Sequence, residues 1–298
     1  MAIVAPASNI QRDALLAGCE TLERQGYKPL YFNSIFDQDL YFAGCVERRA
    51  RELEEMFENE EVRAIICARG GYGANYLLQA INPEKIITNP KIFVGYSDIT
   101  TLLTCLADSA RFVTFHGPMV TKDFALSDHV DFASWEAALT GVSQWDIDTG
   151  AESGVKGLVE GEAEGMLYGG CLSMLVASLG TPYEIRTEGT ILFIEDVAAK
   201  PFQIDRMLMQ LKLAEKLKFV KGIVFGEMLD CYQVRDQGYT LEEVVTRIVG
   251  SLGVPVAFGL RSGHVTRRNV TLPIGVKSHL RVKGGDVKLR ILEAATAG

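Results

Sequence analysis

The chain has 298 residues, of which 48% are hydrophobic and 23% charged, a composition typical of soluble globular proteins that leaves room for two domains. Its formal net charge of -8 excludes a general nucleic-acid or anionic-membrane binder, because no basic excess is present to neutralise phosphates. The N-terminus has no positively charged region, and no apolar run reaches the length of a membrane span, so we expect a cytoplasmic protein.

Short apolar segments alternate with helical patterns over the first 115 residues. Nearly continuous apolar strands in alternation with helices predict a parallel sheet that is covered on both faces. The predicted strands lie at residues 2–5, 29–32, 62–68, 92–94 and 112–115, and the predicted helices at residues 12–24 and 45–59.

The periodicity fades after residue 118, and residues 146–164 are rich in Gly, Asp, Glu and Ser. We therefore predict an N-terminal α/β domain at residues 1–145, a linker at residues 146–164 and a C-terminal α/β domain at residues 165–298. The elements predicted in the last part are helices at residues 168–179, 204–217 and 241–252, strands at residues 190–195, 222–225 and 255–258, and a terminal strand or hairpin at residues 280–292.

Ser97 lies where a predicted strand changes into a predicted helix. The strand ends at Gly95, and helical periodicity begins at Asp98. A serine at such a turn projects its side chain toward the free N–H groups of the helix, which suits a nucleophile. A second interpretation stays open, in which Ser97 or Asp98 only caps the helix. The full G-x-S-x-G elbow pattern is also not met, because Ile99 replaces its second glycine.

Two further residues have the chemistry that a nucleophilic serine needs. His264 lies in a glycine-flanked loop after a predicted strand, where an imidazole can transfer protons, although a plain surface histidine is the commoner outcome. Glu195 ends an apolar strand, so its carboxylate needs a partner inside the core. Either it orients a histidine through the Nδ1–H group, or it forms a salt bridge with Lys200 or Arg206.

The segment RGGYG at residues 69–73 follows a predicted strand. Its glycines let backbone N–H groups approach an anion, either a phosphate or the oxyanion of a tetrahedral intermediate. The segment lacks the G-x-G-x-x-G pattern and the Lys-Ser or Lys-Thr pair of a P-loop, so a plain tight turn is a fair alternative. Neither H-E-x-x-H nor a paired-cysteine spacing occurs, and we expect no metal and no cofactor.

Six segments together resemble, in order and spacing, the motifs of the LD-carboxypeptidase family of serine peptidases, which includes the microcin C immunity peptidases. The resemblance implies a triad of Ser97, Glu195 and His264. It also implies an oxyanion hole formed by the backbone N–H groups of Gly71 and Asp98. The segments are RGGYG (69–73), GYSDIT (95–100), YGG (168–170), FIEDV (193–197), IDRMLMQL (204–211) and GHVTRRNVTLPIG (263–275).

The resemblance carries further implications for fold and function. The expected fold class is α/β, with an N-terminal flavodoxin-like parallel sheet domain, a second, smaller C-terminal α/β domain, an active site between them and a homodimer. The implied activity is release of the terminal D-alanine from murein tetrapeptides in peptidoglycan recycling. Arg69 and Tyr72 are candidate substrate-binding residues. The cation of Arg69 suits a terminal carboxylate, and packing of Arg69 against backbone is an equal alternative. Cys171 replaces the asparagine of the family pattern, a difference that concerns substrate binding.

Two other functions remain as alternatives. An immunity peptidase that hydrolyses microcin C-like aminoacyl-nucleotide antibiotics would keep the chemistry and change the substrate. It ranks second because that branch tends to carry an aromatic-bearing insertion, whereas the two tryptophans, Trp135 and Trp145, precede the predicted linker. A non-catalytic phosphate-binding or nucleotide-binding module built on residues 69–73 would leave Ser97, Glu195 and His264 without a purpose.

Overall fold

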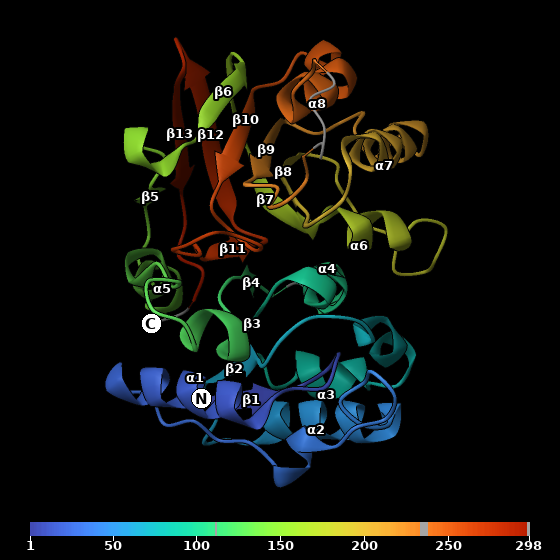
Figure 1. Cartoon of the computed structure of the whole chain (residues 1–298), viewed down its shortest axis with the longest axis vertical. Coiled ribbons are helices and arrows are strands. Elements are labelled where there is room, and N and C mark those ends of the chain that lie inside the picture. Colours follow the sequence, from blue (N-terminus) through green and yellow to red (C-terminus); the bar gives the residue numbers. More distant parts are fainter. Residues whose placement is uncertain (111, 233–237, 297–298) are drawn as a thin grey trace.

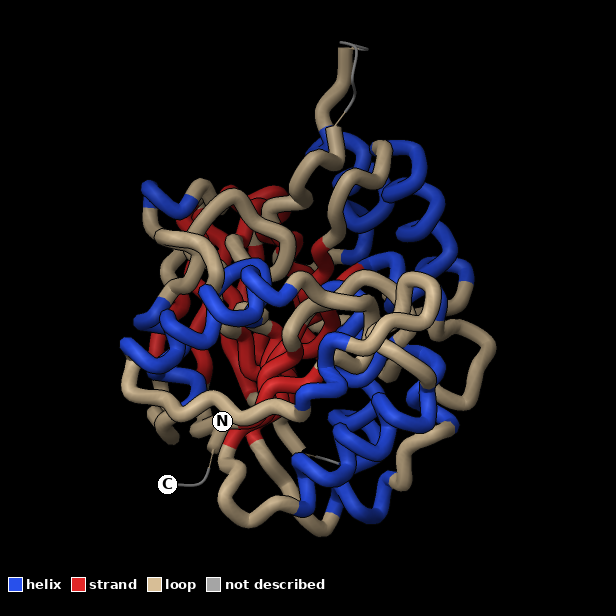
Figure 2. Tube along the Cα trace, turned by 60° about the horizontal axis from the view of Figure 1, so that its bottom comes forward, coloured by secondary structure: helices blue, strands red, loops and turns tan. Residues whose placement is uncertain are grey.

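The structure is a computed structural model that describes residues 1–110, 112–232 and 238–296 (Figure 1). A five-stranded sheet and an eight-stranded sheet form the centres of two domains. The strands gather in the interior and the helices lie mainly around them (Figure 2). The described residues contain no helix that is long and apolar enough to cross a membrane.

The first sheet is parallel over four strands, as its apolar segments predict. β11, from the C-terminal part of the chain, pairs antiparallel with β4 and forms one edge. The strands, in the order in which they pair, are β1 (Ala2–Val4), β2 (Ala64–Cys67), β3 (Ile92–Gly95), β4 (Thr114–His116) and β11 (Leu272–Ile274).

The strand predicted at residues 29–32 is reduced to a single bridge. Leu30 pairs in parallel with Ala2 on the side of β1 that faces away from β2. This prediction was wrong because the segment lies at the sheet edge with Leu30 43% exposed, so little burial stabilises a longer pairing. If the bridge is counted as the second strand, the order becomes 2-1-3-4-5, the flavodoxin-like order. The predicted fold class is confirmed.

Helix α1 matches its prediction at both ends. It spans Arg12–Arg24 and buries Leu15, Cys19 and Leu22, which recur at the i, i+4, i+7 spacing of one face. A 3₁₀ turn at Ser97–Ile99 precedes α4, so the regular helix begins later than the sequence predicts. The other helices of this domain are α2 (Val46–Glu58), α3 (Pro83–Ile87), α4 (Thr100–Ala110) and α5 (Phe132–Leu139).

The second sheet is mixed and includes much of the segment predicted as a linker. Its order is β5-β13-β12-β7-β8-β9-β10-β6. Residues 146–164 supply most of β5, all of β6 and the start of β7, where half-buried and exposed positions alternate as in a strand with one solvated face. The domain boundary itself stays a prediction. The strands are β5 (Trp145–Ile147), β6 (Lys156–Val159), β7 (Gly161–Cys171), β8 (Thr190–Glu195), β9 (Gly222–Gly226), β10 (Val256–Leu260), β12 (Lys277–Lys283) and β13 (Asp286–Ile291).

The helix predicted at residues 168–179 begins later than expected. Strand β7 continues to Cys171 in parallel with β8, and α6 spans only Leu172–Ala177. A Cβ on Gly169 would lie 2.0 Å from the carbonyl oxygen of Phe193 in β8, and a Cβ on Gly170 would lie 2.6 Å from Thr100 Oγ1 in α4. The first glycine therefore permits close strand pairing and the second permits close packing against α4, rather than a helix entry. The remaining helices are α7 (Pro201–Leu213) and α8 (Leu241–Val249).

The two domains meet where β3, β4 and β8 end. His116 at the end of β4 faces Glu195 at the end of β8, and the backbone N–H of Cys171 donates to Thr100 Oγ1 in α4 at 3.0 Å. β11, β4 and β7 accordingly lie near the middle of the molecule (Figure 1). The carboxyl ends of parallel strands are where α/β proteins bind ligands, so this junction is the place to look for a site.

Candidate active site

Ser97 occupies a sharp turn directly after β3. Its φ is 64°, in the left-handed region that residues other than glycine seldom adopt. Asp98 does not cap the helix, because its Oδ2 accepts from the N–H of Ala74 in the neighbouring loop at 2.7 Å. Within the described part of the chain no hydrogen bond from a side chain caps this turn. The backbone therefore has the conformation of a nucleophile elbow, and such a strained conformation is typical of a functional residue.

Two glycines make room for this elbow: Gly70 in the neighbouring loop and Gly95, the first glycine of the pattern. A Cβ on Gly70 would lie 2.8 Å from Ser97 Cβ and 3.0 Å from Ser97 Oγ. A Cβ on Gly95 would lie 2.7 Å from Ile99 Cγ2. The close approach that a second glycine provides in G-x-S-x-G is thus provided by the neighbouring loop and by the end of the strand, so the elbow forms despite Ile99.

Glu195 is fully buried and holds His264 in place. Its Oε2 accepts from His264 Nδ1 at 2.8 Å and from the backbone N–H of the same residue at 3.1 Å. In the described residues it forms neither of the alternative salt bridges, to Lys200 or to Arg206. With Nδ1 occupied, Nε2 of His264 is the ring atom left for proton transfer.

Tyr96 connects the serine and the histidine. It directly precedes Ser97, is 1% exposed, and its ring centroid lies 5.1 Å from that of His264 in an edge-to-face arrangement. The structure therefore brings Ser97, Glu195 and His264 to one place. Among the described contacts no hydrogen bond joins Ser97 Oγ to the imidazole, and such bonds often form only when a substrate is bound.

The charge on Glu195 is stabilised by imidazoles. Burial by itself raises the pKa of a carboxyl group, but His264 and His116 together hold the pKa of Glu195 well below its usual range. Glu195 is therefore ionised at neutral pH, as an orienting carboxylate has to be. His116, whose Nε2 lies 3.7 Å from Glu195 Oε1, is a neighbour that the sequence interpretation missed. The available signal was that His116, like Glu195, follows an apolar strand directly.

The loop that carries His264 is fixed by an amide. Asn269 Oδ1 accepts from the N–H of Gly263 at 2.8 Å, and Asn269 Nδ2 donates to the Gly263 carbonyl at 3.1 Å. The same amide donates to Asp123 Oδ1 at 3.2 Å, and Asp123 belongs to the N-terminal domain. Both side chains are buried, so this contact ties the histidine loop to the domain of the serine. Sequence reasoning did not single out either residue.

The RGGYG loop is held beside the elbow by several backbone contacts. Ser8 Oγ accepts from the N–H of Tyr72 at 3.0 Å, and Arg49 donates to the carbonyl of Gly73 at 2.9 Å. Asp98 accepts from the end of the same loop, as described above, and burial raises the pKa of Asp98 to about 6. The candidate oxyanion donors, Gly71 and Asp98, therefore belong to segments that are bonded to each other.

Arg69 and Tyr72 remain candidates for substrate contacts. Arg69 is exposed and donates to the carbonyl of Asn9 at 3.3 Å, which is the backbone packing considered as its alternative role. Tyr72 is 42% exposed and its ring centroid lies 5.8 Å from that of Tyr41 and 6.1 Å from that of Tyr76. Both side chains lie at the loop, and their described contacts leave them accessible to a substrate.

Cys171 lies beside the site as a buried neutral thiol. It pairs with Glu195 in the register of β7 and β8, and burial raises its pKa well above the usual value. Its Sγ lies 3.9 Å from Ser173 Oγ. A thiol bonds more weakly than the amide of the family pattern, so this position offers less to a polar substrate group.

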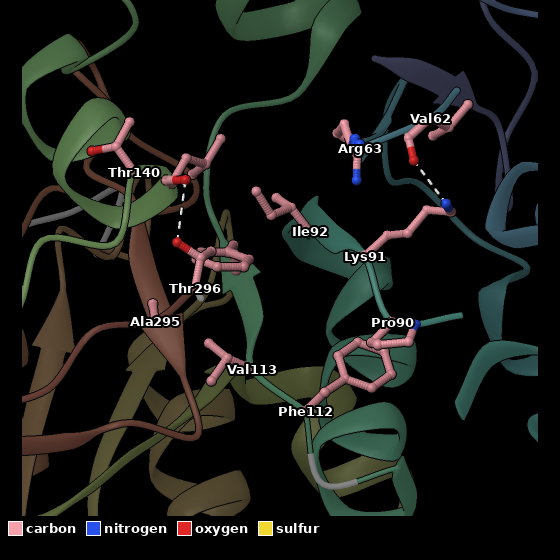
Figure 3. A pocket seen from close by; sticks show the side chains of 12 residues that line it. Val62, Arg63, Pro90, Lys91, Ile92, Phe112, Val113, Thr140, Ala295 and Thr296 are labelled. Carbon is pink, nitrogen blue, oxygen red and sulfur yellow. Dashed lines mark hydrogen bonds between the residues drawn. The ribbon is translucent and has the colours of Figure 1, made fainter. Parts of the chain in front are cut away.

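A separate cavity of about 550 Å³ lies at the opposite end of β3 (Figure 3). It is lined by Arg63, Lys91, Ile92 and Phe112 among others, and Lys91 Nζ donates to the carbonyls of Asn59 and Val62 at 2.8 and 2.7 Å. None of the residues of the candidate active site lines it. No group of three or more His, Cys, Asp or Glu residues suited to a metal occurs in the described ranges.

Two protein-family models match the chain, one in each half. Residues 1–117 match the LD-carboxypeptidase N-terminal domain, and residues 164–280 match the LD-carboxypeptidase C-terminal domain. The chain is 38% identical to a probable murein peptide carboxypeptidase of Bacillus subtilis, over 99% of this chain and 92% of that protein. It is 30% identical to the microcin C7 self-immunity protein MccF of Escherichia coli, over 92% of this chain and 87% of that protein.

A solved structure agrees over the full length. The crystal structure of muramoyltetrapeptide carboxypeptidase from Oxalobacter formigenes has a TM-score of 0.87 and 30% sequence identity, covering 99% of both chains. The fold and these matches define a serine-type hydrolase with two α/β domains. The chain belongs to the LD-carboxypeptidase family, which confirms the resemblance found in its motifs.

Proposed function

We propose that this protein is a serine carboxypeptidase that releases the terminal D-alanine from murein tetrapeptides. The observation that carries the proposal is the 2.8 Å contact between His264 Nδ1 and the buried carboxylate of Glu195, next to a serine in a left-handed turn. Family membership and the names of the relatives support the substrate class.

The proposed reaction follows the logic of a triad. Ser97 Oγ attacks the carbonyl carbon of the bond to D-alanine while His264 Nε2 takes the hydroxyl proton. His264 then gives that proton to the amine of D-alanine, which leaves, and the shortened peptide stays bound to Ser97 as an ester. A water molecule, deprotonated by His264, hydrolyses the ester and restores the serine. Glu195 orients the imidazole and stabilises its positive form throughout.

The oxyanion of each tetrahedral intermediate would accept hydrogen bonds from the backbone N–H groups of Gly71 and Asp98. Such donors typically contribute a few kcal/mol each to the stability of the transition state. The substrate's terminal carboxylate also needs a partner, and the exposed guanidinium of Arg69 next to the loop is our candidate.

Mass spectrometry of a murein tetrapeptide incubated with the protein tests the proposal. The wild type is expected to remove one D-alanine, and Ser97→Ala to lower turnover by about 10⁴- to 10⁶-fold with the fold intact. Near-normal turnover by Ser97→Ala would rule out the nucleophile. A murein pentapeptide, included in parallel, tests whether the enzyme requires the tetrapeptide end.

A second candidate is an immunity peptidase that acts on an aminoacyl-nucleotide, favoured by the 30% identity to MccF. Against it, Trp135 is 1% exposed and Trp145 is partly buried in the core, so Trp135 is not available to stack on a nucleobase. An aminoacyl-sulfamoyl adenylate belongs in the same assay. Cleavage of the adenylate with survival of the tetrapeptide would favour this candidate.

The homodimer and the cytoplasmic role in peptidoglycan recycling are part of the same proposal and rest on the family resemblance. Light scattering coupled to size-exclusion chromatography measures the mass of the protein in solution. A homodimer should have twice the mass of the 32.7 kDa chain.

A further inference from the structure

Two buried polar atoms face each other behind the candidate triad. His116 Nε2 and Glu195 Oε1 lie 3.7 Å apart, and both side chains are fully buried. Within the described residues neither atom has a hydrogen-bond partner. Unpaired buried polar atoms are costly, so two of them placed face to face indicate an interaction between them.

The protonation of His116 follows from its other ring nitrogen. Ser262 Oγ donates to the carbonyl of Val270 at 2.8 Å, which uses the only hydrogen of the hydroxyl. His116 Nδ1, 3.0 Å from the same oxygen, must then be the donor. If His116 were neutral, its Nε2 would present a lone pair to the ionised Glu195. If it is an imidazolium, Nε2–H points at the free carboxylate oxygen.

The charge balance of the site favours the imidazolium. His264 has to be neutral before it can accept the proton of Ser97, so it cannot be the counter-ion of Glu195 in the resting enzyme. A buried carboxylate without a counter-charge is strongly destabilising. Among the described groups, Tyr96, Cys171, Asp196 and Cys231 respond to the charge of Glu195, and none of these four can carry a positive charge.

We infer that His116 is a positioning residue, held as an imidazolium, whose Nε2–H group fixes the carboxylate of Glu195 in the orientation that serves His264. The inference rests on the proposed triad. In this assignment His116 acts through Glu195 and not on the reacting atoms. The rings of Phe193 and Tyr96, with centroids 5.0 and 6.0 Å from that of His116, close the site around it. A Cβ on Gly263 would lie 2.8 Å from His116 Cε1, so the backbone of Gly263 packs closely against the imidazole of His116.

Nitrogen-15 NMR of the histidine side chains in the wild-type protein tests the protonation directly. The chain has four histidines, and His116 is assigned by elimination with His129→Gln, His264→Gln and His279→Gln. Two protonated ring nitrogens on His116 at pH 7.5 are expected. A neutral ring overturns the inference. This measurement needs no turnover, so it remains valid even if the murein substrate is not cleaved. If the substrate is cleaved and His116 is neutral, this inference is refuted and the proposed function is not.

Two variants separate charge from shape. His116→Gln can keep a neutral N–H donor near Glu195, whereas His116→Phe removes both the donor and the charge. We expect kcat/KM to fall by on the order of 10²-fold in His116→Phe and by less in His116→Gln, mainly through kcat. In both variants the acid limb of kcat/KM should move to higher pH, because the uncompensated carboxylate favours protonated His264.

The control is His279→Gln, which breaks a histidine–carboxylate pair of 2.8 Å with Glu162 on the surface of β12 and β7. It should change neither rate nor pH profile. Labelling of Ser97 by a fluorophosphonate gives the same pH profile without a peptide substrate. An acid limb that stays in place in folded His116→Gln, as judged by circular dichroism, would contradict the inference. If neither His116 variant folds, the wild-type NMR result decides.

Discussion

The backbone of Gly70 lies directly against the side chain of Ser97, so that a Cβ at Gly70 would stand 2.8 Å from Ser97 Cβ. The two residues belong to loops that follow neighbouring parallel strands, β2 and β3. The position of the Ser97 side chain therefore depends on the absence of a Cβ in the adjacent loop.

Gly70→Ala should displace Ser97 and lower kcat/KM by on the order of 10²-fold, since small shifts of a reacting group are costly. The matched control is Gly250→Ala after α8, where a Cβ would meet only Thr246 Cγ2, at 3.2 Å. Peptide cleavage and fluorophosphonate labelling measure the effect. Equal rates for the two variants would show that Ser97 tolerates the added methyl.

Ser97→Gly should be more stable than Ser97→Ala. The φ of 64° is strained for any residue with a Cβ and relaxed for glycine. The expected difference in the free energy of unfolding is about 1 kcal/mol, measured by urea denaturation. Both variants lack the serine hydroxyl, so the comparison concerns stability alone and needs no activity assay. If the alanine variant is the more stable one, the turn is not strained.

Glu195→Gln should lower kcat/KM by about 10⁴-fold, less than Ser97→Ala, because the orienting member of a triad contributes less than the nucleophile. The amide keeps the shape and removes the charge that His264 requires. Glu162→Gln, which alters the exposed pair with His279, is the control and should leave the rate unchanged. A loss equal to that of Ser97→Ala, with unchanged stability, would contradict the assigned order.

Asp98→Asn should change how stability depends on pH. Burial raises the pKa of Asp98 from 3.8 to about 6, so the folded state holds this proton more tightly than the unfolded state. Its contribution to stability is complete below pH 3.8 and is lost as the pH rises through 6, by about 3 kcal/mol. The variant lacks this loss, so its stability relative to wild type should increase between pH 4 and pH 7.

Urea denaturation at several pH values across this range measures the difference. Asn can still accept the hydrogen bond from the N–H of Ala74, which keeps the loop contact. A difference in unfolding free energy that stays constant with pH would mean that Asp98 is not the group that titrates.

Much of the architecture could be predicted from local pattern. The face of α1 is defined by residues three and four apart, so its bounds at Arg12 and Arg24 follow from the chain alone. Strand β8 was likewise predicted with its observed bounds, because the continuous apolar run at residues 191–194 is typical of a buried strand. The family motifs brought Ser97, Glu195 and His264 to attention for the same reason: each lies at the end of a locally recognisable element.

The sequence by itself thus determined the alternation of strands and helices, the fold class and the membership of a family. Only the tertiary structure decided the partners of Glu195, because His264 lies 69 residues away and His116 on a strand of the other domain. It also decided that β7 continues to Cys171 and that β11 joins the first sheet, since strand pairing depends on neighbours that are distant in the chain. Local propensity describes one segment at a time, whereas burial and pairing are properties of segments brought together.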